Sequence, residues 1–336
     1  MFDVVVVGAG PVGLYTAHLC EDMGYKVLVL EKNKEVGKPL RCSGLISRNI
    51  EKFFPDINGW EVIENKIDSA ILHSKRSELV LKKAKAAYVI NRVLFDKKIS
   101  EMVRSEISFN CKAQKLRISD GHAAIDTNKG AVKCEMAAAC DGPGSVFRKN
   151  GVAVKGLIAV VKKSDSSSHV DLYFDKKMLN DGFFWKIPRG KTTEYGAWGM
   201  NAKFSDIEKF FGIKAYEKFA GLIPIGAVRK SYAERLLMVG SAAGQVKPWS
   251  GGGVVYGLTC AQIAAKTIEK AFRFNDFSES VFAGYENEWK KKIGKQIKLG
   301  ILFRKFLKNS NDFHLDLALR AGKFFSYNWM DMDFIL

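Results

Sequence analysis

The sequence is poor in cysteine and proline and contains no long apolar segment. Its 336 residues include six cysteines and seven prolines. The cysteines form no Cys-x-x-Cys pair, which disfavours zinc sites and thioredoxin-like centres, and we expect no metal. No uninterrupted apolar run reaches the roughly 18 residues that a membrane-spanning helix requires. A strand pattern starts at Phe2 with no secretory leader before it, so we expect reduced thiols and a cytoplasmic protein.

Acidic residues are also scarce relative to basic ones. The chain has 36 Asp and Glu against 53 Lys and Arg, which gives a formal net charge of +17. Such an excess predicts an acidic partner: an anionic membrane, nucleic acid or anionic small molecules. No recognised nucleic-acid motif accompanies the charge, so we expect no nucleic acid. The remaining composition, 47% hydrophobic and 26% charged, is that of a globular chain with about two domains.

The N-terminal segment carries the pattern of a dinucleotide-binding unit. A buried-strand run over residues 2–7 leads into Gly8-Ala9-Gly10-Pro11-Val12-Gly13. Residues 11–23 then have helical character, and residues 26–31 form a second strand run that ends in an acid. A strand, a glycine turn, a helix and a second strand in this order are far more specific than a glycine motif alone.

Each residue of this motif has a physical role. Gly8 permits the tight turn, Gly10 lets a pyrophosphate approach the backbone, and Gly13 lets helix and strand pack closely. The helix N-terminus presents its free amides and its dipole to the phosphates. Glu31 can accept hydrogen bonds from an adenosine ribose, which favours FAD or NAD over NADP. The alternative is a glycine turn with a structural role only.

Two later stretches identify the class of dinucleotide. A small-residue strand ends in Cys140-Asp141-Gly142-Pro143-Gly144, and a later strand leads into Gly240-Ser241-Ala242-Ala243-Gly244, followed by Pro248, Gly251-Gly252-Gly253 and a helix over residues 254–272. Together with the N-terminal motif they resemble the FAD-dependent p-hydroxybenzoate hydroxylase superfamily. The resemblance implies an α/β fold with a Rossmann-like FAD-binding domain. It also implies that the late loop contacts the ribityl chain and that the three glycines approach the isoalloxazine. Ser241 replaces the aspartate of the family, which leaves a shorter and neutral group.

Three further stretches resemble the geranylgeranyl reductase family, most closely its archaeal branch, which saturates isoprenoid membrane lipids. They are Gly37-Lys38-Pro39-Leu40-Arg41-Cys42-Ser43-Gly44, the strip from Phe183 to Gly190, and Arg92-Val93-Leu94-Phe95-Asp96. In the aromatic strip Phe183 and Ile187 replace the Tyr and Phe of the family, so a hydroxyl is lost.

The resemblance assigns roles to individual residues. It implies that Cys42 acts beside the flavin and that Phe183 and Trp185 line the substrate. It also implies FAD contacts at Val12, Cys42, Ser43, Arg92, Ala113, Asp141, Gly240, Ser241, Gly252, Gly253 and Val254. The alternatives remain open: a lone cysteine as a small buried hydrophobe, Trp185 as a core aromatic, and Arg92 as a capping or surface arginine.

The organisation along the chain follows from these motifs. We expect a discontinuous FAD-binding domain at residues 1–150 and 232–275, with a β-rich substrate domain at residues 151–231. Strand-like runs are found at residues 152–162, 170–174, 183–187 and 194–200, and the pattern predicts a helix over residues 205–219;. Residues 276–336 are expected to form a helical, basic C-terminal region.

The C-terminal region has two interpretations. Residues 289–308 contain no acid, and Trp289, Ile293, Ile297 and Ile301 recur every four residues. This pattern suits a helix that lies on an anionic membrane, on the inner face of the cell membrane. It also suits a helix whose apolar stripe packs on the protein and whose basic face is solvated.

The expected function is FAD-dependent reduction of C=C bonds in geranylgeranyl chains, in membrane ether lipids or prenyl diphosphates. An FAD-dependent monooxygenase of the same superfamily is the first alternative, and an inactive membrane-surface binding module is the second. The sequence does not identify the electron donor, for which ferredoxin, a deazaflavin and NAD(P)H are open.

Overall fold

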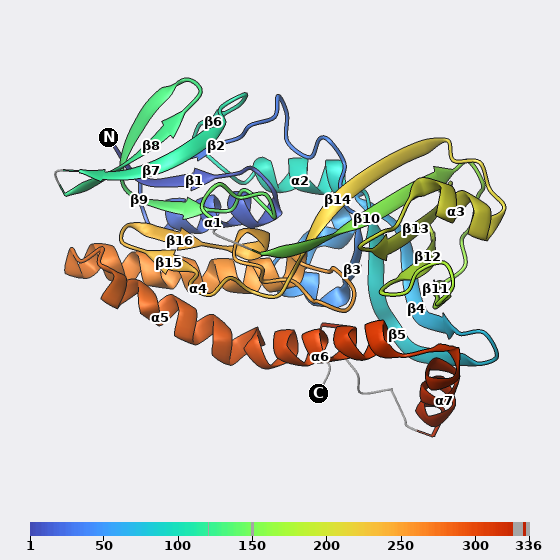
Figure 1. Ribbon diagram of the computed structural model, residues 1–336. Coiled ribbons are helices and arrows are strands. Elements are labelled where there is room, and N and C mark those ends of the chain that lie inside the picture. Colours follow the sequence, from blue (N-terminus) through green and yellow to red (C-terminus); the bar gives the residue numbers. More distant parts are fainter. Residues whose placement is uncertain (120, 149–150, 325–331, 334–336) are drawn as a thin grey trace.

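The computed structural model describes residues 1–119, 121–148, 151–324 and 332–333, and it contains two sheets and a layer of C-terminal helices (Figure 1). The first sheet has the order β15-β16-β9-β1-β2-β6, and the antiparallel strands β7 and β8 extend it through β9. Its strands are β1 (Phe2–Val7), β2 (Val27–Leu30), β6 (Ile107–Ser108), β7 (Ala113–Ser119), β8 (His122–Thr127), β9 (Gly130–Ala139), β15 (Tyr232–Ala233) and β16 (Leu236–Met238).

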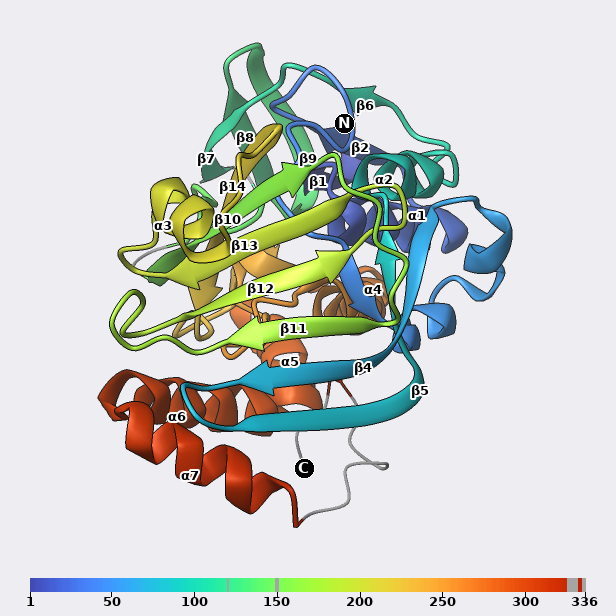
Figure 2. The ribbon, with the colours of Figure 1, turned by 90° about the vertical axis from the view of Figure 1, so that its right-hand side faces the viewer.

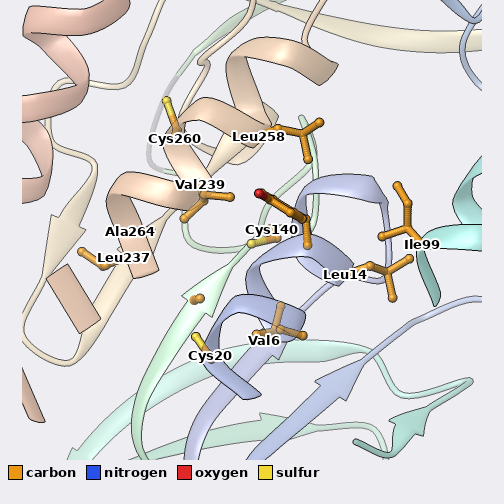
Figure 3. Packing of buried hydrophobic residues seen from close by; sticks show 14 of the residues in the cluster. Val6, Leu14, Cys20, Ile99, Cys140, Leu237, Val239, Leu258, Cys260 and Ala264 are labelled. Carbon is orange, nitrogen blue, oxygen red and sulfur yellow. The ribbon is translucent and has the colours of Figure 1, made fainter. Parts of the chain in front are cut away.

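Parallel pairing in this sheet explains the unbroken apolar run of β1. The strand pairs in parallel with β2 on one side and with β9 on the other. Val4 and Val6 point into a core with α1 (Pro11–Asp22) and α4 (Val254–Phe274), part of which Figure 3 shows. Val5 and Val7 belong to a second core on the opposite face. A strand covered on both faces needs apolar residues at every position.

The second sheet has the order β14-β10-β13-β12-β11-β4-β5-β3, and Figure 2 shows it face on. Its strands are β3 (Leu45–Ser47), β4 (Ile63–His73), β5 (Glu78–Ile90), β10 (Val152–Val161), β11 (His169–Tyr173), β12 (Phe183–Pro188), β13 (Thr193–Gly199) and β14 (Glu217–Ile225). Along β12, Phe183 and Trp185 face one core cluster, whereas Phe184 faces another. The period of two of a β-strand therefore separates the two faces of this sheet.

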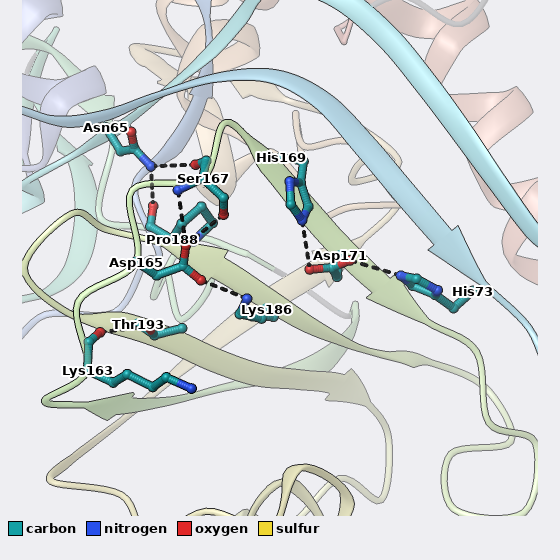
Figure 4. Close-up of polar contacts among 10 residues, drawn as sticks. All are labelled: Asn65, His73, Lys163, Asp165, Ser167, His169, Asp171, Lys186, Pro188 and Thr193. Atoms are coloured by element: carbon teal, nitrogen blue, oxygen red, sulfur yellow. Dashed lines mark hydrogen bonds and ion pairs between the residues drawn. The ribbon is translucent and has the colours of Figure 1, made fainter.

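A group of polar contacts fixes the edge loops of this sheet (Figure 4). Lys186 Nζ lies 2.7 Å from Asp165 Oδ2. The side-chain amide of Asn65 donates to the carbonyl oxygens of Ser167 and Pro188, both at 3.0 Å. These bonds connect β4 to segments about 100 residues later in the chain.

The prediction of an α/β fold with a Rossmann-like domain is confirmed. Two local expectations differ from the structure. Strands β3, β4 and β5 lie within residues 1–150, the range expected for the FAD-binding domain. They belong instead to the second sheet, which they join through the parallel pairing of β4 with β11. The helix expected over residues 205–219 is α3 (Phe204–Phe211), which ends at Gly212 with a φ of +62°. Glycine adopts this left-handed geometry without strain, so the helix ends at this residue. The chain then continues toward β14.

Short helices flank the strands, and longer helices close the chain. The former are α2 (Arg92–Ser100) and the 3-10 turns η1 (Arg48–Lys52), η2 (Pro55–Gly59) and η3 (Gly240–Ala242). The latter are α5 (Glu279–Trp289), the π-helical turn η4 (Lys290–Gly294), α6 (Lys295–Asn309) and α7 (Asp312–Gly322). Within the described parts of the chain, none of the helices has the length and apolar character needed to cross a bilayer.

The apolar stripe of the C-terminal region packs on the protein. Trp289, Ile293 and Ile297 are almost fully buried in the core with α4, so these three residues do not face a membrane. Ile301 alone of the four is exposed. Of the expected region 276–336, residues 325–331 and 334–336 lie outside the described residues.

Candidate active site

The glycine turn between β1 and α1 has the geometry that a phosphate requires. Gly8 has a φ of +103°, and a Cβ there would lie 2.7 Å from the carbonyl oxygen of Cys140. A Cβ on Gly13 would lie 1.9 Å from the carbonyl oxygen of Gly8. In contrast, a Cβ on Gly10 would meet nothing within 4 Å. Gly8 and Gly13 are therefore needed for packing, and Gly10 leaves space in front of the helix N-terminus.

Glu31 is fixed beside this turn at the end of β2. One carboxylate oxygen accepts a hydrogen bond from the backbone N–H of Ala9 at 2.8 Å, and the other accepts from the backbone of Asn33 at 2.8 Å. The carbonyl oxygen of Glu31 accepts from the N–H of Cys111 at 2.8 Å. Ala113, two residues later, is buried at the start of β7. The structure thus places Ala113 on the Glu31 side of the turn, where an adenosine would lie.

Val12 joins the first and the last glycine motifs. Its side chain lies 3.1 Å from the position of a Cβ on Gly240 and 2.4 Å from that of a Cβ on Gly257. The segment that follows the middle motif reaches the late one through Arg148, whose Nη1 donates to the carbonyl oxygen of Ser241 at 3.3 Å. The three motifs, far apart in sequence, therefore converge.

Asp141 carries a buried oxygen that can accept a hydrogen bond from a hydroxyl group of a bound dinucleotide. Oδ2 accepts from the N–H of Val146 at 3.2 Å, but Oδ1 is buried without a hydrogen-bond partner among the described residues. Burial is the main reason that the pKa of this carboxyl lies above its ordinary value. A buried polar atom without a partner is costly. The open side of Gly10 and this oxygen together show that the site fits a dinucleotide.

The late loop leads directly into the N-terminus of α4. The N–H of Gly240 donates to Oε1 of Gln245 at 2.7 Å. Ser241 Oγ lies 3.5 Å from where a Cβ on Gly253 would stand, and α4 begins at the next residue, Val254. Gly251 has a φ of +75° and packs against Ile223 of β14. The backbone of the three glycines is thus held between β14 and the start of a 21-residue helix.

The cysteine loop packs against the strand that precedes Arg92. A Cβ on Gly44 would lie 2.2 Å from the carbonyl oxygen of Ile90. The N–H of Gly44 lies 3.5 Å from Cys42 Sγ. Cys42 is half-buried, unlike the five other cysteines, which are buried. The interpretation of Cys42 as one more buried small hydrophobe is therefore weakened.

Arg92 is a buried ion-pair partner at the start of α2. Its Nε and Nη2 donate to the two carboxylate oxygens of Asp96, both at 3.0 Å. Burial by itself lowers the pKa of Arg92, but the charges of Asp96 and Cys42 and hydrogen bonds to both hold it above its ordinary value. The alternative of a surface arginine is therefore wrong, and the guanidinium lies beside the thiol of the cysteine loop.

An ion-pair cluster connects the aromatic strip to the cysteine loop. Trp185 Nε1 donates to Oε1 of Glu194 at 2.9 Å, and Arg189 Nη1 lies 2.8 Å from Oε2 of the same carboxylate. Arg189 also donates to the carbonyl oxygen of Ser43, the residue after Cys42. Phe183 and Trp185 pack in one cluster, with ring centroids 6.2 Å apart. The structure thus places Phe183 and Trp185 on the same face of the second sheet and connects Trp185 to the residue after Cys42 through Glu194 and Arg189.

Sequence reasoning missed three charged residues near these groups. Arg189 lies within the aromatic strip and could have been found as one of its two basic residues. Glu194 and Lys247 are almost fully buried, at 1% and 3% exposure, but nothing in their sequence context distinguishes them from surface charges.

Comparisons with known proteins agree with this geometry. A family model described as an NAD(P)-binding Rossmann-like domain matches residues 6–43. A digeranylgeranylglycerophospholipid reductase of Methanocaldococcus jannaschii is 29% identical, over 96% of this chain and 90% of the relative. An uncharacterised protein of the same organism is 30% identical, over 93% of this chain and 86% of its own length. The chain belongs to the geranylgeranyl reductase family.

Solved structures show how widely the fold of this family is shared. A geranylgeranyl bacteriochlorophyll reductase-like protein of Thermoplasma acidophilum superposes with a TM-score of 0.89 at 20% identity, over 98% of this chain and 94% of that one. The halogenase PltM, solved in complex with FAD, reaches 0.72 at 15% identity, over 95% and 79% of the two chains. The fold of the geranylgeranyl reductase family is thus that of the FAD-dependent oxidoreductases.

Proposed function

We propose that this chain is an FAD-dependent reductase that saturates C=C bonds of geranylgeranyl chains. The observation that carries the proposal is the link from Ser43, the neighbour of Cys42, through Arg189 and Glu194 to the aromatic wall. By the aromatic wall we mean Phe183, Trp185 and Trp198. Family membership supports the same reaction class, since named relatives are digeranylgeranylglycerophospholipid reductases. The substrate is an isoprenoid chain carried by an ether lipid or a prenyl diphosphate.

The residues of the three converging motifs would hold FAD. The amides at the start of α1 face the pyrophosphate across Gly10, and Glu31 and Ala113 lie on the adenosine side. Asp141 and Ser241 offer oxygens to the ribityl hydroxyls. The N-terminus of α4 favours negative charge, and so Val254 and the preceding glycines suit the ring of a reduced flavin.

The chain's own residues must protect and polarise the alkene. Bound FAD, once reduced, supplies hydride to one alkene carbon, and a proton must reach the other, so each bond gains two hydrogens. Positive charge develops on an isolated alkene, and it is stabilised by aromatic faces in a dry site. Phe183 and Trp185 provide such faces. We infer that Cys42, whose Sγ lies 3.5 Å from the Gly44 amide nitrogen and beside Arg92, holds or delivers the proton.

We infer that α6 and α7 rest on an anionic membrane, which would bring the enzyme to its lipid. Their outer face exposes Leu302, Phe306, Phe313 and Leu317, with exposures of 61%, 45%, 69% and 55%. An apolar hollow on this face is lined by Leu302, Lys305, Phe306, Asn309, Ser310 and His314. Exposed apolar side chains beside lysines are typical of interfacial helices. This face differs from the stripe expected from sequence, in which Trp289, Ile293 and Ile297 are buried.

The decisive experiment is a reduction assay under anaerobic conditions. The purified holoprotein is reduced with dithionite and incubated with a geranylgeranyl ether lipid, and the lipid is analysed by mass spectrometry. We expect a gain of two hydrogens for each bond reduced. An unchanged mass with ether lipid and with prenyl diphosphate would reject the reductase. Rapid NADPH oxidation with oxygen consumption and a hydroxylated product would identify a monooxygenase in its place.

A further inference from the structure

A buried lysine lies against the glycine loop that precedes α4. Lys247 is 3% exposed, and its Cε lies 2.5 Å from the position of a Cβ on Gly252. Its ammonium lies 2.9 Å from Oδ1 of Asp333 and 3.3 Å from the carbonyl oxygen of Met332. None of the roles proposed above uses this charge.

Donors from separate elements surround the carboxylate of Asp333. Ser47 Oγ, at the end of β3, and Asn49 Nδ2, in η1, both donate to Oδ2, the latter at 3.0 Å. The hydroxyl of Tyr256, in α4, donates to the main-chain carbonyl of Asp333 at 2.5 Å. Burial by itself raises the pKa of Asp333, but Lys247 and the donors from Ser47 and Asn49 lower it overall. The surroundings of this carboxylate therefore select for an anion.

The position of these donors adds a further favourable field. The 21-residue helix α4 starts at Val254, two residues after Gly252, and no side chain caps its N-terminus. The free amides and the dipole of a helix N-terminus stabilise nearby negative charge. Lys247 and the N-terminus of α4 thus both contribute positive potential next to the glycine loop.

The residue before Asp333 occupies apolar surroundings. Met332 packs against the core cluster that contains Phe183, Trp185 and Trp198. Two adjacent residues therefore contact both groups: Met332 packs on the aromatic wall, and the carboxylate of Asp333 pairs with Lys247. A prenyl phosphate presents the same two chemical features next to each other.

We propose that Ser47, Asn49 and Lys247 form a binding site for the phosphate of a prenyl phosphate or phospholipid, and that Asp333 occupies this site as an internal competitor. The part that concerns the prenyl chain rests on the proposed function, whereas the anion site does not. A buried ammonium needs a partner because leaving it unpaired is strongly destabilising. When Asp333 leaves, another anion must therefore take its place.

The first test measures thermal unfolding of the holoprotein with and without inorganic phosphate. Asp333→Asn should lower the Tm, and phosphate should then raise the Tm of this variant by several degrees more than that of the wild type. The additional rise should vanish in Asp333→Asn/Lys247→Met and persist in Asp333→Asn/Lys266→Met, where Lys266 is an exposed lysine of α4. An equal rise in all four proteins would overturn the anion site.

The second test compares two ligands with the same chain, geranylgeranyl phosphate and geranylgeraniol, by equilibrium binding without reduction. Lys247→Met should weaken the phosphate ester by at least about tenfold and leave the alcohol unchanged, and Lys247→Arg should retain the affinity. Asp333→Asn should strengthen binding of the phosphate ester. Equal effects on both ligands would overturn the proposal.

The two proposals can fail separately. Charge-dependent binding by a protein that reduces no alkene would leave the anion site standing and reject the reductase. Alkene reduction and ligand binding that do not depend on Lys247 would support the reductase and reject the anion site. Binding of inorganic phosphate that does not compete with geranylgeranyl phosphate would overturn the assignment of the site to the lipid head.

Discussion

The indole nitrogen of Trp185 donates to the buried carboxylate of Glu194 at 2.9 Å, and the other oxygen of that carboxylate is paired with Arg189. Burial raises the pKa of Glu194, and Arg189 opposes that rise. Arg189 also donates to the carbonyl oxygen of Ser43 and lies 2.6 Å from Oε2 of Glu64. The Glu194 carboxylate therefore connects the aromatic wall to an arginine that also holds the cysteine loop.

Glu194→Ala should destabilise the fold by about 2 kcal/mol, because it leaves the buried indole N–H of Trp185 without its acceptor;. It also removes one of the two carboxylates that pair with Arg189, and Glu64 remains, 2.6 Å from Arg189 Nη2. Urea unfolding of the variant measures this loss. Glu194→Gln should lose less, since its amide oxygen can still accept from Trp185. In a double-mutant cycle with Trp185→Phe the losses should fall short of additivity. Strict additivity would show that the two side chains are not coupled.

Gly10→Asp should abolish FAD binding without unfolding the protein. A Cβ at Gly10 meets nothing within 4 Å, so the side chain fits, but its charge would oppose the pyrophosphate. The flavin absorbance that copurifies with the protein reports the binding. Gly13→Ala is the contrasting variant, because its Cβ would lie 1.9 Å from the carbonyl oxygen of Gly8. This variant should lose folding stability in addition to flavin. Retention of flavin in Gly10→Asp would contradict the placement of the pyrophosphate.

Cys42→Ala should reduce turnover by about 100-fold, the usual contribution of a positioned proton donor, and leave FAD bound. The stoichiometry of bound flavin and the rate of lipid reduction are measured on the same preparation. Cys134→Ala, which changes a buried cysteine of β9, is the control and should retain the rate. If Cys42→Ala turns over as fast as the wild type, the thiol takes no part in the chemistry.

Asp165→Asn should cost about 2 kcal/mol of stability at pH 7, with a smaller cost in acid. Burial by itself raises the pKa of Asp165, but hydrogen bonds from Lys186 and Ser167 and the charge of Lys186 bring it down to about 2. A carboxyl with a lowered pKa in the folded state stabilises the protein at neutral pH and loses this effect as the pH falls from about 4 toward about 2. Urea unfolding at pH 7 and pH 3 should show the difference between variant and wild type shrinking to about half. A difference that does not change with pH would exclude the ion pair as its cause.

Leu302→Ser/Phe306→Ser should weaken binding to vesicles of anionic phospholipid by about tenfold, because each change removes exposed apolar area from the proposed contact. Vesicle flotation at low and moderate salt measures the bound fraction. Phe274→Ser is the matched control, since Phe274 is 63% exposed at the end of α4. A similar loss in the control variant would show that binding does not depend on the α6–α7 face.

The N-terminal turn could be predicted well from sequence because its signals are local. Gly8, Gly10 and Gly13 follow one strand and open one helix, so the pattern alone specifies their geometry. The placement of β4 could not be predicted, since its pairing with β11 joins residues 69–73 to residues 169–173. Pairing over such separations leaves no trace in local periodicity.

Periodicity also identified an apolar face without identifying what covers it. Trp289, Ile293 and Ile297 form a true stripe, but α4 and its neighbours cover it. The same limit applies to Lys247, whose partner lies 86 positions later in the chain. Burial and pairing of charges depend on tertiary contacts that a linear pattern does not contain.

The contact of Val12 with Gly240 and Gly257 has a consequence for biogenesis. Val12 belongs to one wall of the proposed coenzyme pocket, and the opposite wall is synthesised more than 220 residues later. A ribosome-bound nascent chain that ends before α4 therefore has half a pocket. Coenzyme capture must therefore wait until the segment with Gly240 and Gly257 has left the ribosome and closed over Val12.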